Sequence, residues 1–489
     1  MHQAISNYKA FMKIIGAIIL ITGIAMLVPL VYALAAGDTK DAQAFIRVAP
    51  ASILLGLILT LGFKSTNAKF RIRDGYLVVA LCWVAASLIG AFPYYYSEFT
   101  NDFIDAFFES TSGFTTTGCT AVKDGVLSHS LLLWKALSHW LGAMGILIFV
   151  LSILPALGIN GQFIAKAEAP GPIFEKMAVR LSDSTKILYI TYIVLTLLEF
   201  LLLVASPKVD AFDALVNSLG SISTGGLLVH TDGVAHYNSF YVEFVISIFC
   251  ILSSVNFMLY HYLRSGKISK VFRDTELRLF LSLIGAGIVI CTVVLMTVND
   301  AKFTSAFRDS FFQVISMSTT TGYVRSPYTL WPTTCQLVLF TLMLIGGCSA
   351  STSGSIKVIR FAVMIKMILR GTYKHVHPRS VVPIRINDSI VPPKVVSGMS
   401  EFILTYLAIL LFSSIVVSIQ GLDFDTTVST VLAMLSNTGA AFGITLSAGN
   451  FAAYSAGLKL YLCLLMYIGR LEIFTILVMF TRHFWNKKR

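Results

Sequence analysis

Residues 309–322 read DSFFQVISMSTTTG, and residues 105–118 read DAFFESTSGFTTTG. In both stretches an aspartate precedes a short, half-apolar segment that ends in threonines and a glycine. Similar strings occur twice more in the chain, and the four copies are Thr115–Gly118, Ile222–Gly225, Thr319–Gly322 and Ser436–Gly439. A unit of about a hundred residues therefore recurs four times, which indicates an internally repeated fold.

The aspartates keep their place relative to the strings. Asp105, Asp213, Asp309 and Asp425 precede the glycines by 13, 12, 13 and 14 residues. At ~1.5 Å per residue, a helix in this interval crosses only about half of a hydrocarbon core that is ~30 Å thick. The chain must enter and leave on one side of the membrane, which predicts four re-entrant pore helices. The helix dipole favours a carboxylate at a helix N-terminus, so we expect the aspartates there, mainly as caps.

The composition is that of a membrane protein. Of the 489 residues, 56% are hydrophobic and 13% are charged, which excludes an ordinary soluble globular protein. Ten apolar stretches approach the length of a membrane span. They cover roughly residues 11–35, 48–63, 76–92, 130–155, 186–206, 238–263, 279–298, 334–347, 401–420 and 457–481. The first is predicted to be a span and not a cleaved signal peptide.

Two kinds of loop alternate between these stretches. Basic residues cluster at 64–73, 166–186, 264–273, 357–394 and 487–489, and acidic or mixed loops lie between the clusters. The positive-inside rule then predicts that both termini are cytoplasmic. Because this distribution accounts for the net charge of +12, we expect membrane lipid, and not nucleic acid, as a partner.

These features predict an all-α integral membrane protein. Four M1–pore loop–M2 pseudo-repeats would surround one central, K+-channel-like pore, with two extra N-terminal transmembrane helices. The expected boundaries are 1–73 for the N-terminal pair and 74–180, 181–273, 274–394 and 395–489 for the repeats.

The strings suit an ion filter. Non-helical backbone at membrane depth must line a cavity or be buried in protein, and rings of backbone carbonyls pass K+ by replacing its hydration shell. Glycine permits the dihedral angles that aim such carbonyls. One string alone would be equally well explained as a helix cap, but four copies at matched positions favour a filter. The expected K+ ligands are the carbonyls of Thr116, Thr117, Gly118, Ser223, Thr224, Gly225, Thr320, Thr321, Gly322, Asn437, Thr438 and Gly439.

Together with Gly346–Gly354, Ala167–Pro172 and Gly469–Glu472, the four strings resemble the Trk/Ktr/HKT superfamily of potassium transporters, and most of all its bacterial TrkH-type branch. The resemblance implies potassium uptake across the bacterial inner membrane by a homodimer with one pore per subunit. It also implies a cytosolic, TrkA-like ring of nucleotide-binding regulatory subunits. The chain has no Walker A string, so we expect its partner to bind the nucleotide. In this family a serine at the first filter glycine accompanies Na+ permeation, and Gly118 therefore favours K+.

A run of small and polar residues interrupts the apolar stretch after residue 334. Such residues are unfavourable in a lipid-facing helix, and the alternatives are a tightly packed kink or a loop. By resemblance the run is an intramembrane gate beneath the filter. The predicted gate residues are Gly346, Gly347, Cys348, Ser349, Ala350, Ser351, Thr352, Ser353 and Gly354.

Arg470 interrupts the last apolar stretch. A charge at this depth costs several kcal/mol on insertion scales, so we expect it to face the pore or a partner group. It would either form an electrostatic barrier beside the gate or pair with a buried carboxylate. Glu472 is two residues away and lies on another face of the helix, so it is not the expected mate.

Other functions and residue roles stay open. A Na+-coupled symporter of the same superfamily and the K+-binding subunit of a P-type pump share the four-repeat plan. A membrane enzyme such as a lipid transferase is disfavoured, because the nine histidines are scattered and the strings carry no acid or base; we expect no catalytic residues. His139 is expected to be a packing residue. Arg325 would modulate the outer mouth or be a solvated surface charge.

Overall fold

The computed structural model describes residues 8–63, 72–100, 102–122, 127–145, 181–387, 389–443 and 450–485. Helices form nearly all of the regular structure in these ranges, together with one antiparallel pair of two-residue strands, β1 (Arg385–Ile386) and β2 (Ser389–Ile390). The predicted all-α fold is therefore confirmed. The basic clusters at 64–71, 166–180 and 487–489 and the Ala167–Pro172 segment lie outside the described residues.

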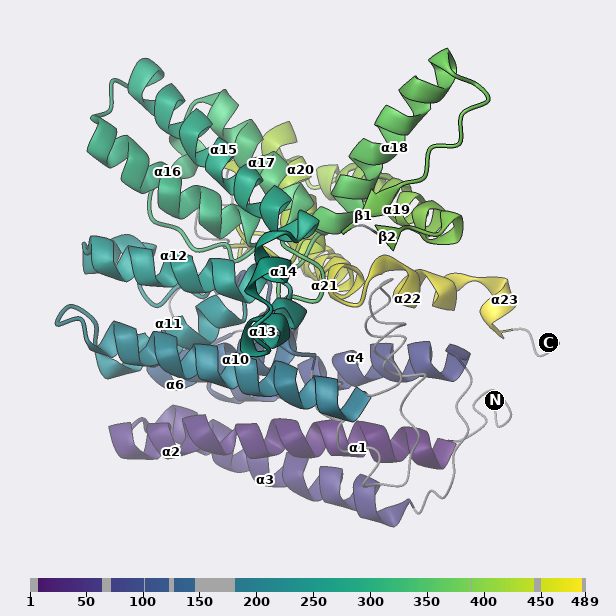
Figure 1. Cartoon of the computed structure of the whole chain (residues 1–489). Coiled ribbons are helices and arrows are strands. Elements are labelled where there is room, and N and C mark those ends of the chain that lie inside the picture. Colours follow the sequence, from purple (N-terminus) through teal and green to yellow (C-terminus); the bar gives the residue numbers. More distant parts are fainter. Residues whose placement is uncertain are drawn as a thin grey trace.

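An N-terminal pair of spans packs through glycines. The chain begins with α1 (Tyr8–Ala25) and α2 (Leu27–Ala36) and returns as α3 (Thr39–Gly62). A Cβ added at Gly16 would lie 2.6 Å from Leu59 Cβ, and one added at Gly56 would lie 2.6 Å from the main-chain nitrogen of Leu20. Small residues therefore let α1 and α3 approach closely, as is common between membrane helices. Figure 1 shows these helices as a layer along one side of the molecule, where they contact α4 and α6.

The rest of the chain repeats one plan four times, in the order long helix, short helix, second helix. The long helices are α4 (Ile72–Tyr96), α10 (Leu181–Val204), α15 (Thr275–Val298) and α19 (Pro393–Ser418). The short helices are α5 (Phe103–Phe114), α11 (Ala211–Ile222), α16 (Phe303–Ser318) and α20 (Phe424–Leu435). The second helices are α6 (His129–Ala143), α12 (Phe240–Ser254), α17 (Thr333–Ile345) and α21 (Ala456–Arg470).

Contacts between the repeats close into a ring. Each short helix packs against both other helices of its own repeat. In addition, α6 contacts α11, α12 contacts α16, α17 contacts α20, and α21 returns to contact α5. The four short helices are therefore arranged cyclically around the centre of the molecule.

Among the described residues, five helical segments are long and apolar enough to span a membrane by length and composition: Tyr8–Ala36, Thr39–Gly62, Asp74–Tyr96, Thr275–Val298 and Pro393–Ser418. The pair formed by α12 and α13 (Phe257–Arg264) would be a sixth, bent by 92°. Shorter apolar helices cover Leu188–Val204, Thr333–Ile345 and Phe424–Leu435. The chain is thus a multi-pass membrane protein.

The second helices of repeats 2, 3 and 4 are interrupted. α12 ends at Ser254 and α21 at Arg470, each inside a stretch that reads as continuous in the sequence, while α17 ends at Ile345, directly before the run of small and polar residues. After α21 the chain resumes as α22 (Ile473–Leu477), η5 (Val478–Phe480) and α23 (Arg482–Trp485). Sequence reasoning identified only the break in the third repeat, although small polar residues also mark the end of α12.

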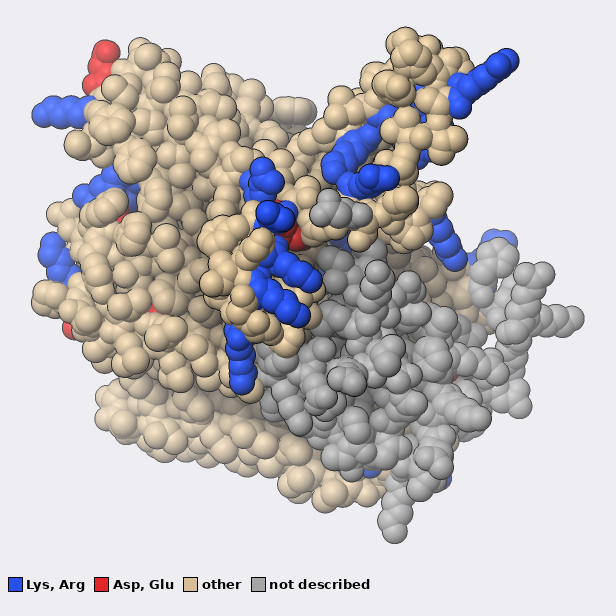
Figure 2. All heavy atoms as spheres, viewed as in Figure 1, with Lys and Arg blue, Asp and Glu red and all other residues tan. Residues whose placement is uncertain are grey.

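The remaining elements connect the helices of the repeats. They are α14 (Ile268–Phe272), α18 (Val358–Val376) and the short 3-10 turns η2 (Gly233–Tyr237) and η3 (Tyr328–Leu330). In Figure 1 α18 projects away from the body of the molecule. Figure 2 shows lysine and arginine side chains gathered over α13, α14 and α18, while most of the remaining described surface in that view carries few charges.

Candidate ion-conducting site

The strings follow directly on the short helices, which fixes their register. The main-chain N–H groups of four residues donate to carbonyls five positions earlier, at 2.9, 2.8, 2.9 and 3.0 Å: Thr117 to Ser112, Gly225 to Gly220, Thr321 to Ser316 and Thr438 to Ala433. These four residues are therefore structurally equivalent. The second string runs from Ser223 to Gly226, and the predicted copy Ile222–Gly225 is wrong by one residue. We number these strings 1 to 4: Thr115–Gly118, Ser223–Gly226, Thr319–Gly322 and Ser436–Gly439.

Backbone angles support the corrected register. The fourth residue of each string is a left-handed glycine: Gly118 has φ 79°, Gly226 56°, Gly322 81° and Gly439 71°. Gly225 lies outside the left-handed region. The second residue of each string is also left-handed, although it is not glycine: Thr116, Thr224, Thr320 and Asn437 have φ between 52° and 56°. Strained residues of this kind persist only where the surroundings hold them, and they cluster at functional sites.

The four strings form a closed ring. A Cβ added to Gly118 would lie 2.0 Å from the carbonyl oxygen of Gly225 in string 2, and one added to Gly226 would lie 1.9 Å from that of Thr321 in string 3. In the same way Gly322 faces the Thr438 carbonyl at 2.0 Å, and Gly439 returns to the Thr117 carbonyl at 1.9 Å. Each fourth-position glycine thus abuts the third-position carbonyl of the next string, and any side chain there would collide with it.

Hydroxyl groups support three of the strings. The first and third residues share a hydrogen bond of 2.8 Å in string 1 (Thr115 and Thr117), in string 3 (Thr319 and Thr321) and in string 4 (Ser436 and Thr438). String 2 has glycine at its third position, and Ser223 Oγ donates instead to the Gly220 carbonyl at 3.0 Å.

A buried ion pair holds the residues that follow string 1. Lys135 Nζ lies 2.6 Å from Glu109 Oε2 and also donates to the carbonyl oxygen of Cys119 at 2.8 Å. The other carboxylate oxygen of Glu109 accepts from the Ala121 N–H at 2.6 Å and from the Thr120 hydroxyl at 2.5 Å. Sequence reasoning missed this pair. Its signal was two opposite charges in apolar surroundings, which membrane proteins rarely tolerate unpaired.

Three of the four predicted pore-helix acids lie in the first turns of their helices, as expected, but they are not the residues that cap those helices. Asp105 and Asp425 lie in the first turns of α5 and α20, but Asp102 and Asp423 are the residues that cap those helices. Asp213 also lies in a first turn, and it accepts hydrogen bonds from Tyr237 at 3.0 Å and contacts His230 at 2.8 Å. Capping as the main role of these aspartates is therefore wrong.

Asp309 is not at a helix N-terminus. α16 begins at Phe303, a full turn and a half before Asp309, so this aspartate lies within the helix. It forms an ion pair with Arg325, whose Nε also lies 2.9 Å from Glu243 Oε1. Because only 15% of the Arg325 side chain is exposed, the interpretation of Arg325 as a solvated surface charge is wrong. The arginine belongs to a mostly buried cluster that Arg308 joins through Glu243.

The predicted gate segment is a loop packed under strings 3 and 4, not a kinked helix. α17 ends at Ile345 and α18 begins at Val358. Ser353 Oγ donates to the Thr319 carbonyl at 2.9 Å, and the Gly354 N–H donates to Thr320 Oγ1 at 2.8 Å. A Cβ added to Gly354 would lie 1.9 Å from the Ser436 carbonyl. We call residues 346–354 the intramembrane loop.

Two further elements hold the intramembrane loop. The broken end of α12 accepts from it, because the Cys348 N–H donates to the Ser254 carbonyl at 2.9 Å. Glu276, in the first turn of α15, accepts from the N–H and the hydroxyl of Ser349 at 2.6 and 2.7 Å. The loop is therefore anchored in repeats 2 and 3 at the same time. Glu276 was also missed, since its spacing from the loop in sequence is large.

Arg470 lies where the loop meets string 1. Its Nη1 donates to Thr116 Oγ1 at 3.1 Å and to the Thr352 carbonyl at 3.0 Å. Its Nη2 donates to the carbonyls of Gly142 and Ala143 at the end of α6, at 2.8 and 2.6 Å. As expected, Glu472 lies apart from this set and pairs with Arg360 at 2.6 Å.

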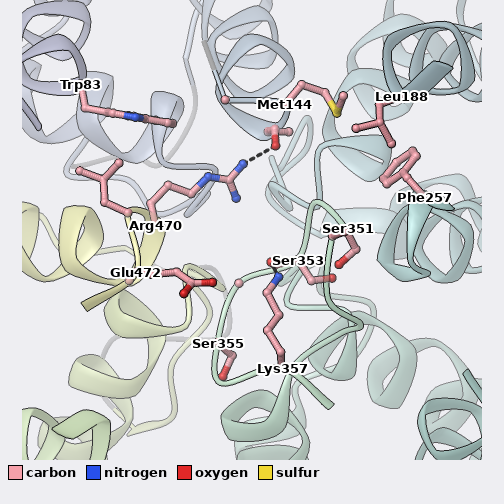
Figure 3. Close-up of a pocket in the computed structure, with 16 residues that line it drawn as sticks. Trp83, Met144, Leu188, Phe257, Ser351, Ser353, Ser355, Lys357, Arg470 and Glu472 are labelled. Atoms are coloured by element: carbon pink, nitrogen blue, oxygen red, sulfur yellow. Dashed lines mark hydrogen bonds between the residues drawn. The ribbon is translucent and has the colours of Figure 1, made fainter. Parts of the chain in front are cut away.

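A cavity of ≈ 170 Å³ opens beside these groups. Its lining includes Arg470, Lys357, Ser353 and Trp83. Figure 3 shows Arg470 reaching into it from α21 while Lys357 extends from the opposite side toward Ser353, whose carbonyl accepts its ammonium group. Two cationic side chains therefore border the space below the strings.

A multi-pass chain with four re-entrant helices around a ring of backbone carbonyls is a membrane transport protein of the pore type. The family model of TrkH, described as a cation transport protein, matches residues 41–487, and the chain belongs to this family.

Individual relatives agree over nearly the whole chain. The chain is 34% identical to the Trk system potassium uptake protein TrkH of Salmonella typhimurium over 487 residues, which cover 98% of this chain and 100% of the relative. It is 33% identical to the Trk system potassium uptake protein TrkG of Escherichia coli, covering 86% of this chain and 87% of that protein. The crystal structure of the potassium transporter TrkH from Vibrio parahaemolyticus matches with a TM-score of 0.87 and 28% identity, over 98% of this chain and 100% of that one.

Proposed function

We propose that this chain takes up potassium ions as the ion-translocating subunit of a Trk-type system, and that strings 1 to 4 form its K+ filter. The closed ring carries the proposal, because the third-position carbonyl of each string abuts the fourth-position glycine of a neighbouring string in all four repeats. Such carbonyl rings replace the hydration shell of K+. The names of the relatives support potassium as the ion.

The filter includes the second to fourth residues of each string. With the corrected register, repeat 2 contributes Thr224, Gly225 and Gly226 in place of Ser223, Thr224 and Gly225. The other ligands are those expected from the sequence. The hydroxyl pairs behind strings 1, 3 and 4 keep the carbonyls in place, so a desolvated ion meets preformed oxygens.

The intramembrane loop and Arg470 form the proposed gate. The loop touches strings 3 and 4 directly, while Arg470 joins it to string 1. A fixed positive charge in a low-dielectric passage repels a K+ ion. For the gate to open, the hydrogen bonds from the loop to Thr319 and Thr320 must break. Arg470 must then move together with the loop.

The proposed assembly is a homodimer in the bacterial inner membrane, with both termini cytoplasmic and a nucleotide-binding regulatory ring beneath. The basic surface over α13, α14 and α18 supports this orientation, since positive loops remain inside (Figure 2). The proposed repeat boundaries at 73/74, 180/181, 273/274 and 394/395 lie near the starts of the long helices α4, α10, α15 and α19.

Ion flux into liposomes tests the function. Purified protein is reconstituted and given gradients of K+, Rb+ or Na+, with Gly322→Ser as the filter variant and Gly371→Ser as the matched control. A Cβ at Gly322 would lie 2.0 Å from the Thr438 carbonyl, whereas one at Gly371 meets nothing within 4 Å. We expect K+ and Rb+ to pass, Na+ to lag, and only the Gly322 variant to lose this preference.

The same assay separates the alternatives. Conduction by the protein alone, down a K+ gradient, argues against a subunit that needs an ATPase partner. A K+ flux that requires Na+ on the same side indicates symport. If neither the wild type nor Arg470→Ala moves any cation, the channel-like function is wrong.

A further inference from the structure

String 2 differs from the other three at its third position. Strings 1, 3 and 4 have Thr117, Thr321 and Thr438 there, and all three side chains are at most 1% exposed. String 2 has Gly225. Since Gly225 is not left-handed, its backbone does not require glycine, and the absence of a side chain needs another explanation.

The explanation is a side chain from the neighbouring repeat. A Cβ added to Gly225 would lie 2.6 Å from Nδ1, 2.8 Å from Cγ and 3.2 Å from Cε1 of His139. His139 comes from α6, which packs against α11, and its side chain is fully buried. The imidazole ring therefore occupies the place where the other strings hold a threonine side chain.

We infer that His139 is a positioning residue for the ion filter: its ring supports string 2 from behind, as a threonine side chain does in the other strings. The inference rests on the proposed filter function of the strings. The carbonyl of Gly225 is the one that Gly118 faces, so the ring holds the contact between strings 1 and 2. A string that is supported from behind cannot move outward, so its carbonyls keep a fixed distance from the ion.

Neighbouring contacts on α6 agree with this role. Lys135, one turn before His139, donates to the Cys119 carbonyl just beyond string 1. Gly142, three residues after His139, packs against the carbonyl of Phe114 at the end of α5, where an added Cβ would lie 1.8 Å away. One face of α6 thus supports the filter in two repeats, and His139 makes its contact with string 2.

A double-mutant cycle tests the inference with His139→Ala, Gly225→Thr and the double variant. His139→Ala leaves a cavity behind string 2, and Gly225→Thr puts a side chain against the ring. The double variant restores the arrangement of the other strings. His129→Ala is the control, because this exposed histidine lies at the other end of α6.

Two measurements are made on each protein. Thermal unfolding reports the packing of His139 against Gly225 whether or not the protein conducts. The K+ to Na+ flux ratio in liposomes reports the filter. We expect each single variant to lower the melting temperature and to lower the flux ratio about tenfold, and the double variant to recover most of both losses, because contacting residues couple strongly. The control should match the wild type.

The outcomes separate this inference from the proposed function. A double variant that is no better than the worse single variant in either measurement overturns the role of His139, as does an unchanged flux ratio in folded His139→Ala. Recovery of stability in the double variant, together with a wild type and an Arg470→Ala variant that both pass no K+, would establish the packing and reject the filter function itself.

Discussion

The guanidinium group of Arg470 donates to the main-chain carbonyl of Thr352 at 3.0 Å, and the same Nη1 atom donates to Thr116 Oγ1 at 3.1 Å. One side chain therefore connects α21, the second helix of repeat 4, with the intramembrane loop of repeat 3 and with string 1. A movement of the loop must break or carry along this connection, which makes Arg470 the residue most directly linked to both the proposed filter and the proposed gate.

Replacement of Arg470 by alanine is expected to increase K+ flux. The change removes a positive charge and the hydrogen bond from Arg470 to the Thr352 carbonyl of the loop. Lowering the barrier by about 1.4 kcal/mol would raise the flux about tenfold. Arg470→Lys keeps the charge but loses the forked geometry of the guanidinium group. Its K+ flux should therefore lie between those of the wild type and Arg470→Ala. Flux is measured in liposomes with matched amounts of folded protein. An unchanged flux in well-folded Arg470→Ala would reject the barrier.

A single methyl group at Gly354 should open the same gate, at the contact between the loop and string 4. Gly354→Ala places a Cβ 1.9 Å from the Ser436 carbonyl, so the loop can no longer fit closely under string 4. We expect a higher K+ flux with unchanged preference over Na+, since the strings themselves are intact. Gly371→Ala is the matched control, because nothing lies within 4 Å of its added Cβ. Equal flux in both variants would contradict a gate at Gly354.

The fourfold plan was predictable because it depends on repetition along the chain. The register of string 2 was not, because Gly225 and Gly226 are adjacent and either could align with Gly118. Only the end of α11 at Ile222 decides between them, and helix ends are set by packing as well as by sequence. The predicted position of Asp309 at a helix N-terminus was wrong for a similar reason. α16 has 16 residues where α5 has 12, and the sequence before Asp309 does not indicate that α16 begins about one turn earlier.

Contacts between residues far apart in the sequence could not be predicted. Lys135 and Glu109 are 26 residues apart, and Glu276 reaches Ser349 across 73 residues. Such contacts depend on which segments of the chain become neighbours in the folded structure. The sequence does show charges inside apolar stretches, and among the described residues Lys135, Glu243 and Lys459 each form an ion pair.

Breaking the pair of Lys135 and Glu109 is expected to destabilise the protein strongly. Both side chains are at most 1% exposed, so Lys135→Met leaves a buried carboxylate without its cation, at a cost of about 3–5 kcal/mol. The double variant Lys135→Met with Glu109→Gln should recover part of this loss. Lys40→Met is the control, because the Lys40–Glu98 pair is 73% and 77% exposed and contributes about 0–1 kcal/mol. Thermal unfolding in detergent distinguishes the two sites, and equal losses would refute the structural role.

Asp423, just before α20, should give the protein a pH-dependent share of its stability. Its carboxylate accepts from Thr426 Oγ1 at 2.5 Å and from the Thr426 N–H at 3.2 Å, and these hydrogen bonds hold its pKa below the ordinary value of 3.8. A lowered pKa in the folded state means that the stabilisation is complete above the unfolded value and is lost as the pH falls through the folded one.

Asp423→Ala should therefore lower the free energy of unfolding by about 1 kcal/mol at neutral pH, the usual contribution of a helix N-cap. The difference from wild type should shrink toward pH ~3, because the wild-type carboxyl is then protonated and accepts hydrogen bonds less strongly. Asp425→Ala is the matched control, since this exposed aspartate is not the cap of α20. Its replacement should lower the free energy of unfolding by less than Asp423→Ala does. Unfolding is followed at both pH values in the same detergent. A difference between Asp423→Ala and wild type that persists undiminished at the lower pH would mean that the charged carboxylate is not what stabilises the start of α20.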